Sequence, residues 1–180
     1  SVLDTAIEAY RRSDPADVSI NAICEMAKVS KPALYREFGN EDGLMAAVLE
    51  RYAEQVLSEI FDILAKAMPV PETLNALTRF ASDSVTMETG CVFFKMRAGK
   101  HRLGPVTRSR VEAIDTGAVD AFNVYLAARR LDGGWTNAVP TASAARYLVE
   151  QIGLALTQRA AGEDPEQVRE TLQLALAAIR

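Results

Sequence analysis

Apolar side chains recur three or four positions apart along most of the chain, which is the spacing of one face of an α-helix. The first such pattern runs through Leu3, Ile7 and Tyr10. It stops before Asp14-Pro15, because a residue that precedes proline is pushed out of the helical conformation. Further helices are predicted at about residues 19–27, 30–38, 40–67, 72–89, 105–131, 140–161 and 164–179, with a brief one near 92–94. The pattern predicts an all-α protein of about nine helices.

Capping residues mark where several of these helices begin. Ser19 and Ser30 each precede an apolar pattern, and a serine there accepts hydrogen bonds from free backbone N–H groups. Pro32 falls in the first turn, where its missing N–H is not needed, and Asn40 caps the next helix. The second and third helices are separated by about three residues, "KVS", so they must cross sharply. This spacing predicts a helix-turn-helix.

The two sides of this helix pair differ in chemistry. The angle between the helices is expected to be filled by Ile20, Ile23, Ala27, Val29, Leu34 and Phe38. The outer side offers an amide, two cations, a phenol and two small apolar contacts: Asn21, Lys31, Pro32, Ala33, Tyr35 and Arg36. In a major groove, cations read guanine and amides read adenine, while hydroxyls and N-terminal backbone amides bind phosphates. The alternative is a solvated helix pair without a DNA partner.

The run "VSINAICEMAKVSKPALYREFGNEDGLMAAVL", residues 18–49, resembles the signature of the TetR family of bacterial transcriptional regulators. The shared elements are the apolar frame of the second helix, the A-x-V-S turn, "LY" followed by an aromatic residue three positions on, then an asparagine and the leucine of the fourth helix. The resemblance implies that the third helix contacts DNA, through Ser30, Lys31, Pro32, Ala33, Tyr35 and Arg36, and that Asn21 on the second helix also faces the DNA. Tyr35 matches a position that usually contacts a phosphate. Glu41 departs from the family pattern, which commonly has a phosphate-contacting lysine there.

The resemblance also implies two domains, a helix-turn-helix DNA-binding domain over residues 1–45 and an effector-binding and dimerisation domain over residues 46–180. Residues of suitable size for a pocket are Phe80, Met87, Phe94, Phe122 and Tyr125, which would alternatively form plain core. A second copy is expected to pack on the last two helices, through Ala145, Val149, Ile152, Gly153, Leu156, Val168, Leu172, Ala175 and Ile179.

The charge distribution works against DNA binding. The chain has a net charge of −4, and residues 1–50 hold five basic and nine acidic side chains. The segment 19–40 itself has a charge of +1. A second group of cations would attract an anionic effector or simply be solvated: Lys95, Arg97, Lys100, Arg102, Arg108 and Arg110.

The residues that enzymes and metal sites need are sparse. His101 is the only histidine, and Cys24 and Cys91 lie far apart, so neither a zinc site nor a disulfide framework is predicted. No glycine-rich phosphate loop and no paired nucleophile and base occur. We expect no cofactor and no catalysis; a rival hypothesis is an enzyme that uses Tyr125, Asp115 or Asp120 as acid or base.

The resemblance to the TetR family therefore implies a ligand-responsive transcriptional regulator that acts as a homodimeric repressor on a palindromic DNA operator. A cytoplasmic protein without membrane attachment is expected. The alternative is a dimeric small-molecule-binding or scaffold protein whose helix-turn-helix no longer binds DNA.

Overall fold

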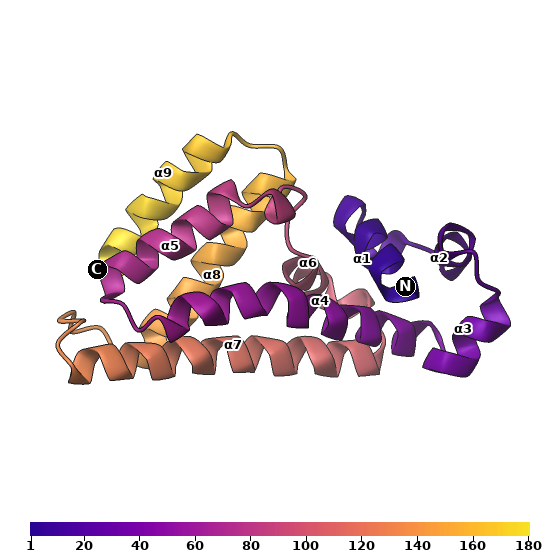
Figure 1. The fold of residues 1–180 in the computed structure, drawn as a ribbon, viewed down its shortest axis with the longest axis horizontal. Coiled ribbons are helices and arrows are strands. Elements are labelled where there is room, and N and C mark those ends of the chain that lie inside the picture. The colour runs from indigo at the N-terminus through magenta and orange to yellow at the C-terminus, as the bar shows by residue number, and fades with distance from the viewer. The chain divides into compact units, whose positions relative to one another are not determined.

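The computed structural model describes residues 1–180 and contains nine α-helices and no strands. The helices are α1 (Val2–Arg12), α2 (Ile20–Ala27), α3 (Lys31–Phe38), α4 (Glu41–Ala65), α5 (Val70–Asp83), α6 (Val92–Ala98), α7 (Pro105–Leu131), α8 (Thr141–Ala160) and α9 (Pro165–Leu176) (Figure 1). Four 3-10 turns join them: η1 (Pro15–Asp17), η2 (Val85–Met87), η3 (Lys100–Arg102) and η4 (Ala177–Ile179). The predicted all-α fold is confirmed. None of the helices has the length and apolar content needed to cross a membrane.

Contacts within the chain define two compact units. The first unit comprises Ser1–Val56 and Val92–Ile114, and the second comprises Leu57–Cys91 and Asp115–Arg180. Helices α4 and α7 contribute residues to both units. The functional boundary predicted after residue 45 stays a prediction.

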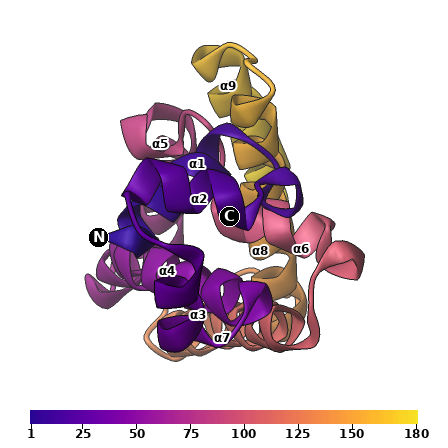
Figure 2. The ribbon, with the colours of Figure 1, turned by 90° about the vertical axis from the view of Figure 1, so that its right-hand side faces the viewer.

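The first unit is built around the N-terminal helices. Helix α1 packs on α2 and α6, and α2 packs on α3. Figure 2 shows α3 at the front of this unit, below α1 and α2. The core is apolar and contains Ala6, Ile7, Tyr10, Ile20, Ile23, Leu34, Leu44, Val48, Leu49 and Tyr52. Since α3 gives only Leu34 to this core, most of its surface remains available.

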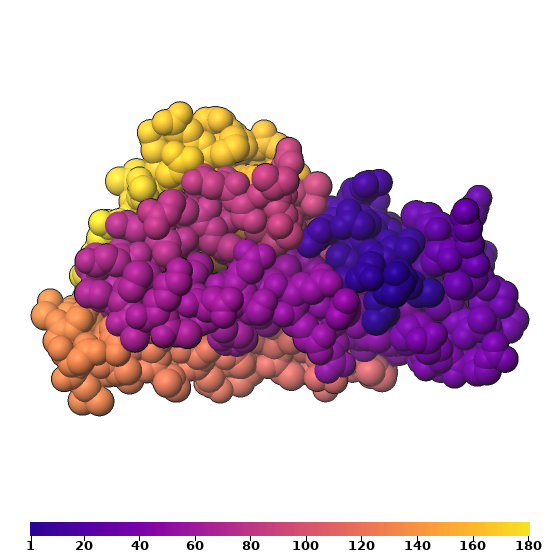
Figure 3. Space-filling view, in the orientation of Figure 1, coloured from indigo at the N-terminus to yellow at the C-terminus, as the bar shows by residue number.

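The second unit is a bundle in which α5 packs on both α8 and α9, and α8 packs on α9. In the space-filling view α9, in yellow, lies on the surface of this unit (Figure 3). Its core includes Leu74, Leu77, Leu126, Leu148, Val149, Ile152, Leu156, Val168, Leu172 and Leu176.

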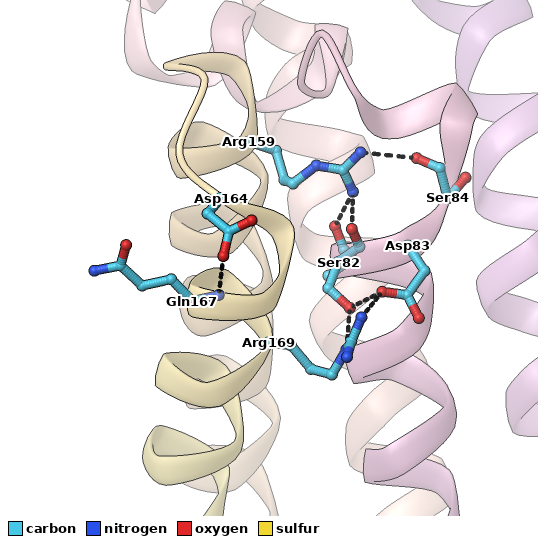
Figure 4. A network of polar contacts seen from close by, with 8 residues as sticks. Ser82, Asp83, Ser84, Arg159, Asp164, Gln167 and Arg169 are labelled. Atoms are coloured by element: carbon cyan, nitrogen blue, oxygen red, sulfur yellow. Dashed lines mark hydrogen bonds and ion pairs between the residues drawn. The ribbon is translucent and has the colours of Figure 1, made fainter.

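One helix ends earlier than predicted. The helix expected over residues 72–89 ends at Asp83, and Ser84 is extended, with φ −62° and ψ 123°. The buried guanidinium of Arg159 donates to the carbonyls of Ala81 at 3.1 Å, of Ser82, and of Ser84 at 3.3 Å (Figure 4). The last carbonyls of a helix have no hydrogen-bond donors within the helix. Arg159, which lies 77 residues after Ser82 in the sequence, donates the hydrogen bonds that they lack.

A second feature of the second unit is the loop after α7. Its Trp135 is 3% exposed, and the indole N–H donates to the carbonyl of Ile179 at 2.8 Å. The guanidinium of Arg130 lies 4.5 Å from the centre of the indole ring. The Asn137 amide donates to the Arg180 carbonyl at 3.2 Å. The predicted loop is therefore a structured connection to the C-terminal turn.

Candidate nucleic-acid interface

Local hydrogen bonds determine the turn between α2 and α3. Lys28 adopts the left-handed conformation, with φ 55°, and its N–H donates to the carbonyls of Cys24 and Glu25. The Ser30 hydroxyl then accepts from the N–H of Ala33 at 3.3 Å and begins α3. The predicted serine cap is confirmed, and the turn is as short as the sequence indicates.

The inner side of the helix pair is apolar, as predicted. Ile20, Ile23 and Leu34 are buried, with 5%, 1% and 1% of their surfaces exposed. Ala27, Val29 and Phe38, which were expected in the same angle, are half-buried. Three of the six predicted residues are therefore buried between the two helices, and the other three are partly accessible to solvent.

The predicted DNA-contacting side chains all keep accessible surface. Asn21, Ser30, Lys31, Pro32 and Arg36 are exposed, and Ala33 and Tyr35 are half-buried. Six of the seven lie on α3 or at its N-terminal cap. Their contact with DNA stays a prediction, developed below.

Three side chains form what we call the Tyr35 cluster: Lys31, Tyr35 and Glu41. The ammonium of Lys31 lies 5.7 Å from the centre of the Tyr35 ring. The Tyr35 hydroxyl donates to a carboxylate oxygen of Glu41 at 3.4 Å. Glu41 also influences a buried tyrosine. Burial raises the pKa of Tyr10 to about 12, and the negative charge of Glu41 contributes to this increase. A carboxylate therefore stands beside the phenol predicted to contact phosphate.

The junction between α3 and α4 places Glu41 in this cluster. Gly39 ends α3 with φ 83°, and its N–H donates to the Tyr35 carbonyl at 2.8 Å. The Asn40 side chain then accepts from the Gly43 N–H at 2.9 Å, which confirms the predicted cap. A Cβ on Gly43 would lie 2.0 Å from the Phe38 carbonyl oxygen, so only glycine permits this approach. Only two residues separate the helices, and positions 35 and 41 are thereby brought together.

The carboxylate of Asp42, at the start of α4, binds the start of α7, and we call this contact the Asp42 clamp. The Asp42 carboxylate oxygens accept hydrogen bonds from the backbone N–H groups of Val106 and Thr107, both at 2.9 Å, and from the Thr107 hydroxyl at 2.6 Å. Thr107 is fully buried. A Cβ on Gly104 would lie 2.3 Å from the Asp42 carboxylate, so the clamp requires glycine there. Asp42 thus caps a helix that begins 63 residues later in the sequence.

The clamp also affects the acidity of Asp42. Burial raises the pKa of this carboxyl, but the hydrogen bonds from Thr107 and Val106 outweigh that effect, and the pKa is lowered overall. The ionised form is therefore the one that the clamp stabilises.

The cations between residues 95 and 110 pair with the rest of the first unit. Lys95 donates to the carbonyls of Tyr10 and Arg11 at the end of α1. Arg102 pairs with Asp14 and Asp17 on the segment before α2. Two further pairs are Arg110 with Glu50 at 3.4 Å and Lys100 with Glu112 at 3.8 Å. The contacts of Lys95, Arg102 and Arg110 attach α6, η3 and α7 to α1, to the segment before α2 and to α4, a role that the sequence did not predict.

The predicted pocket residues fall in both units. Phe80, Met87, Phe122 and Tyr125 are buried in the second unit. The Tyr125 hydroxyl lies 2.7 Å from the Met68 carbonyl and 2.6 Å from the Thr73 hydroxyl. Phe94 belongs to the first unit, where its ring meets Phe93 edge-on at 5.0 Å. The effector pocket stays a prediction.

The residues predicted for the twofold contact are packed inside the chain. All but the half-buried Ala175 are buried: Ala145, Val149, Ile152, Gly153, Leu156, Val168, Leu172 and Ile179. They form the core among α5, α8 and α9, and a side chain buried in its own chain has little surface left for a partner. Two large apolar side chains stay exposed on these helices, Leu154 at 50% and Leu174 at 78%. Dimerisation itself stays a prediction.

The sequence patterns missed the partners of Glu41 and Asp42. Both residues were recognised as acids that favour the N-terminus of α4. The contacts with Tyr35 and with α7 depend on how helices meet. For Asp42, the sequence did contain one signal, at Gly104 and Thr107. The helix that begins there has no local side chain to cap it, which indicates that a cap must come from elsewhere in the chain.

The short turn, the two serine caps and the exposed α3 define a helix-turn-helix. The profile of the family described as bacterial regulatory proteins, tetR family, matches residues 2–48. The whole fold is similar to E. coli NemR in its reduced form, with 17% identity, a TM-score of 0.80, and coverage of 99% of this chain and 95% of that one. A cysteine variant of CifR bound to 26-bp double-strand operator DNA gives 18% identity, a TM-score of 0.80, and coverage of 99% and 95%.

A TetR-family transcriptional regulator from Streptomyces coelicolor, SCO4454, is also similar, with 23% identity, a TM-score of 0.77, and coverage of 99% of this chain and 91% of that one. The search of curated proteins gave no match. Residues 2–48, which include the helix-turn-helix, match the TetR family of bacterial regulatory proteins, and the fold of the whole chain is similar to that of solved TetR-family regulators. These two findings confirm the resemblance seen in the sequence.

Proposed function

We propose that the chain is a homodimeric repressor that binds a palindromic operator and releases it when a small molecule binds. The observation that carries this proposal is the exposed start of α3, where the side chains of Ser30, Lys31, Pro32 and Arg36 are all exposed. Amides and cations at a helix N-terminus bind phosphates, and an arginine or lysine nearby reads guanine. The CifR structure, solved with operator DNA, supports the same use of this fold.

A palindrome requires two copies of α3 about one DNA turn apart, roughly 34–36 Å. We place the twofold contact on α8 and α9, as the family resemblance implies. The exposed face of α8 carries Leu154 and Thr157, and that of α9 carries Thr171 and Leu174. These side chains would pack against their symmetry mates, while the buried residues behind them keep the two helices together.

The ligand response would use helices that belong to both units. Helix α7 carries Phe122 and Tyr125 in the second unit and Thr107 in the first, and α4 carries Leu44 in the first unit and Ile63 in the second. A ligand among the predicted pocket residues favours one arrangement of these helices over another. The favoured arrangement spaces the two α3 helices so that they no longer fit both half-sites, which lowers operator affinity.

Selection of bound duplexes from a random pool at moderate salt tests the DNA-binding part. Wild type is compared with the variant carrying both Tyr35→Phe and Lys31→Ala. Enrichment of a palindrome by wild type alone is the expected result. Lack of enrichment by a folded dimer, verified by sedimentation, contradicts the proposal.

A second candidate function is supported by Glu41 and by the nine acidic side chains of residues 1–50. It is a dimeric small-molecule-binding or scaffold protein whose helix-turn-helix does not hold DNA. Salt dependence separates the two, because each neutralised phosphate makes the logarithm of the binding constant fall by about 0.9 per decade of salt. A steep decrease favours the repressor, and absence of duplex binding at low salt favours the scaffold.

A further inference from the structure

We propose that Glu41 competes with DNA phosphate for the hydroxyl of Tyr35, and so lowers the affinity of the helix-turn-helix for every duplex. The inference rests on the proposed DNA-binding function. It gives an active role to the position at which the chain departs from the family pattern: an autoinhibitory contact that keeps operator binding weak and reversible.

The competition follows from the chemistry of the phenol. A tyrosine hydroxyl has one hydrogen to donate. In the structure that hydrogen goes to Glu41, whose carboxylate oxygen lies 3.4 Å from the Tyr35 hydroxyl oxygen. A phosphate oxygen at the same place needs the same hydrogen. DNA binding therefore replaces the hydrogen bond from Tyr35 to Glu41 by one from Tyr35 to a phosphate. The Glu41 carboxylate and the phosphate, both negatively charged, then lie close to the same hydroxyl.

The backbone keeps Glu41 within reach of this exchange. Asn40 on one side caps α4, and Asp42 on the other side is held by the start of α7. The Glu41 side chain can change rotamer, but its Cα cannot withdraw without breaking a cap or the Asp42 clamp. The carboxylate consequently remains close to a phosphate bound by Tyr35.

The charge balance of the Tyr35 cluster points the same way. The Lys31 ammonium lies 5.7 Å from the centre of the Tyr35 ring, and the hydroxyl of that ring donates to the Glu41 carboxylate. Without the carboxylate, both the phenol hydrogen and the lysine charge are available to the phosphate backbone. Phosphate contacts carry no sequence information, so the gain extends to all duplexes.

A structural role for Glu41 makes a different prediction. An acid in the first turn stabilises a helix through its macrodipole. However, Asn40 already caps α4 and Asp42 supplies a second acid in the same turn. Neutralising Glu41 should therefore leave the helix in place, and a purely structural role predicts unchanged or weaker DNA binding. Competition predicts tighter binding that depends on the Tyr35 hydroxyl.

The experiment measures duplex affinity by fluorescence anisotropy for wild type, Glu41→Gln and Glu41→Ala, on a selected duplex and on an unrelated one. The matched control is Glu54→Gln, an exposed glutamate on the same helix. It lies about 20 Å further along the axis, at 1.5 Å per residue, which is roughly two Debye lengths at 0.1 M salt. Each glutamine variant removes one negative charge. Tyr35→Phe, alone and with Glu41→Gln, completes a double-mutant cycle.

Repulsion between the Glu41 carboxylate and a phosphate about 6 Å away weakens DNA binding about threefold at the dielectric constant of water. A lower effective dielectric constant raises this effect to about tenfold. We expect Glu41→Gln and Glu41→Ala to tighten binding to both duplexes by about three- to tenfold at 0.1 M salt. The gain should shrink at 0.5 M salt because of screening. It should also be smaller in the Tyr35→Phe background, and Glu54→Gln should change affinity by less than about twofold.

Three outcomes overturn the inference. The first is wild-type affinity in both Glu41 variants while wild type binds DNA, which leaves the proposed function intact. The second is an equal gain from Glu54→Gln, which indicates a general charge effect. The third is a lack of duplex binding by all variants at low salt, in which case the proposed DNA-binding function fails as well.

Discussion

Removal of the Asp42 clamp by Asp42→Ala should destabilise the protein measurably. Alanine removes the acceptor of three hydrogen bonds, from the Val106 N–H, the Thr107 N–H and the Thr107 hydroxyl. The hydroxyl keeps one partner, since it also lies 3.0 Å from the backbone carbonyl of residue 42. The Thr107 N–H loses its partner inside a buried site, whereas water can reach the more exposed Val106 N–H.

The magnitude follows from this difference. Loss of a helix cap destabilises a protein by about 0.5–2 kcal/mol, and a buried N–H without a partner by about 1–3 kcal/mol. The two values overlap, because the buried N–H is one of the capped groups. We expect about 2–3 kcal/mol for Asp42→Ala, which lowers the melting temperature by about 4–12 °C in a chain of this size.

Circular dichroism with urea or heat measures this change, and Thr107→Val is the matched control. Valine keeps the shape and both N–H contacts but removes one hydroxyl bond, so we expect a loss of about 1 kcal/mol. A variant Asp42→Ala within about 0.5 kcal/mol of wild type would refute the reasoning, since surface changes of no consequence fall in that range. Water would then replace the carboxylate without loss.

The clamp also has a defined pH dependence. The pKa of Asp42 is lowered in the folded protein, so the clamp contributes its full stability above the pKa of an unfolded aspartate, about 3.9. This contribution is lost as the pH falls through the lowered folded pKa. The stability difference between wild type and Asp42→Ala should therefore be constant between about pH 5 and 8 and shrink as the solution becomes more acid than the pKa of an unfolded aspartate.

Three further predictions concern other parts of the chain. Arg159→Met should destabilise the protein by about 2–4 kcal/mol in urea unfolding, because it leaves carbonyls at the end of α5 buried without partners; Arg169→Met, at a half-buried arginine that pairs with Asp83 near the surface, should destabilise it by no more than about 1 kcal/mol, and equal losses would contradict the assignment. Leu174→Glu should weaken dimerisation at least about tenfold in sedimentation, about 1.4 kcal/mol, since a buried carboxylate is unfavourable; Leu131→Glu, on α7, is the control, and an unchanged dimer would place the interface elsewhere. Arg36→Ala should either relax sequence preference, with a loss of about 1–3 kcal/mol, or reduce the salt slope by about one; titration of selected and unrelated duplexes distinguishes base contact from phosphate contact, and neither change would remove Arg36 from the interface.

The N-terminal half of the fold could be predicted because its signals are local. Ser19, Ser30 and Asn40 each bond to an N–H three residues ahead, so one short stretch of sequence contains both partners. The short "KVS" turn likewise forces the two helices to cross. The same locality explains why the sequence could predict which side of α3 is buried and which side keeps accessible surface.

Features that depend on distant partners were not predictable from the pattern. The end of α5 depends on Arg159, and the cations between residues 95 and 110 pair with acids up to 88 positions away. The apolar stripes of α8 and α9 are another feature whose partner the pattern alone does not identify. An apolar stripe predicts burial, but the sequence does not show whether a helix of the same chain or a second copy covers the stripe. In this chain α5 covers most of the apolar surface of α8 and α9.

Trp135 gives the protein an intrinsic spectroscopic label. It is the only tryptophan in the chain, and it lies in the second unit, shielded from solvent and bonded to the C-terminal turn. Excitation at the red edge of its absorption therefore reports on that unit alone, whereas backbone dichroism reports on both. Denaturation curves from the two signals that coincide would show that the units unfold together. Curves that separate would assign the fluorescence transition to the bundle of α5, α8 and α9, and the other to the helix-turn-helix, without any added dye.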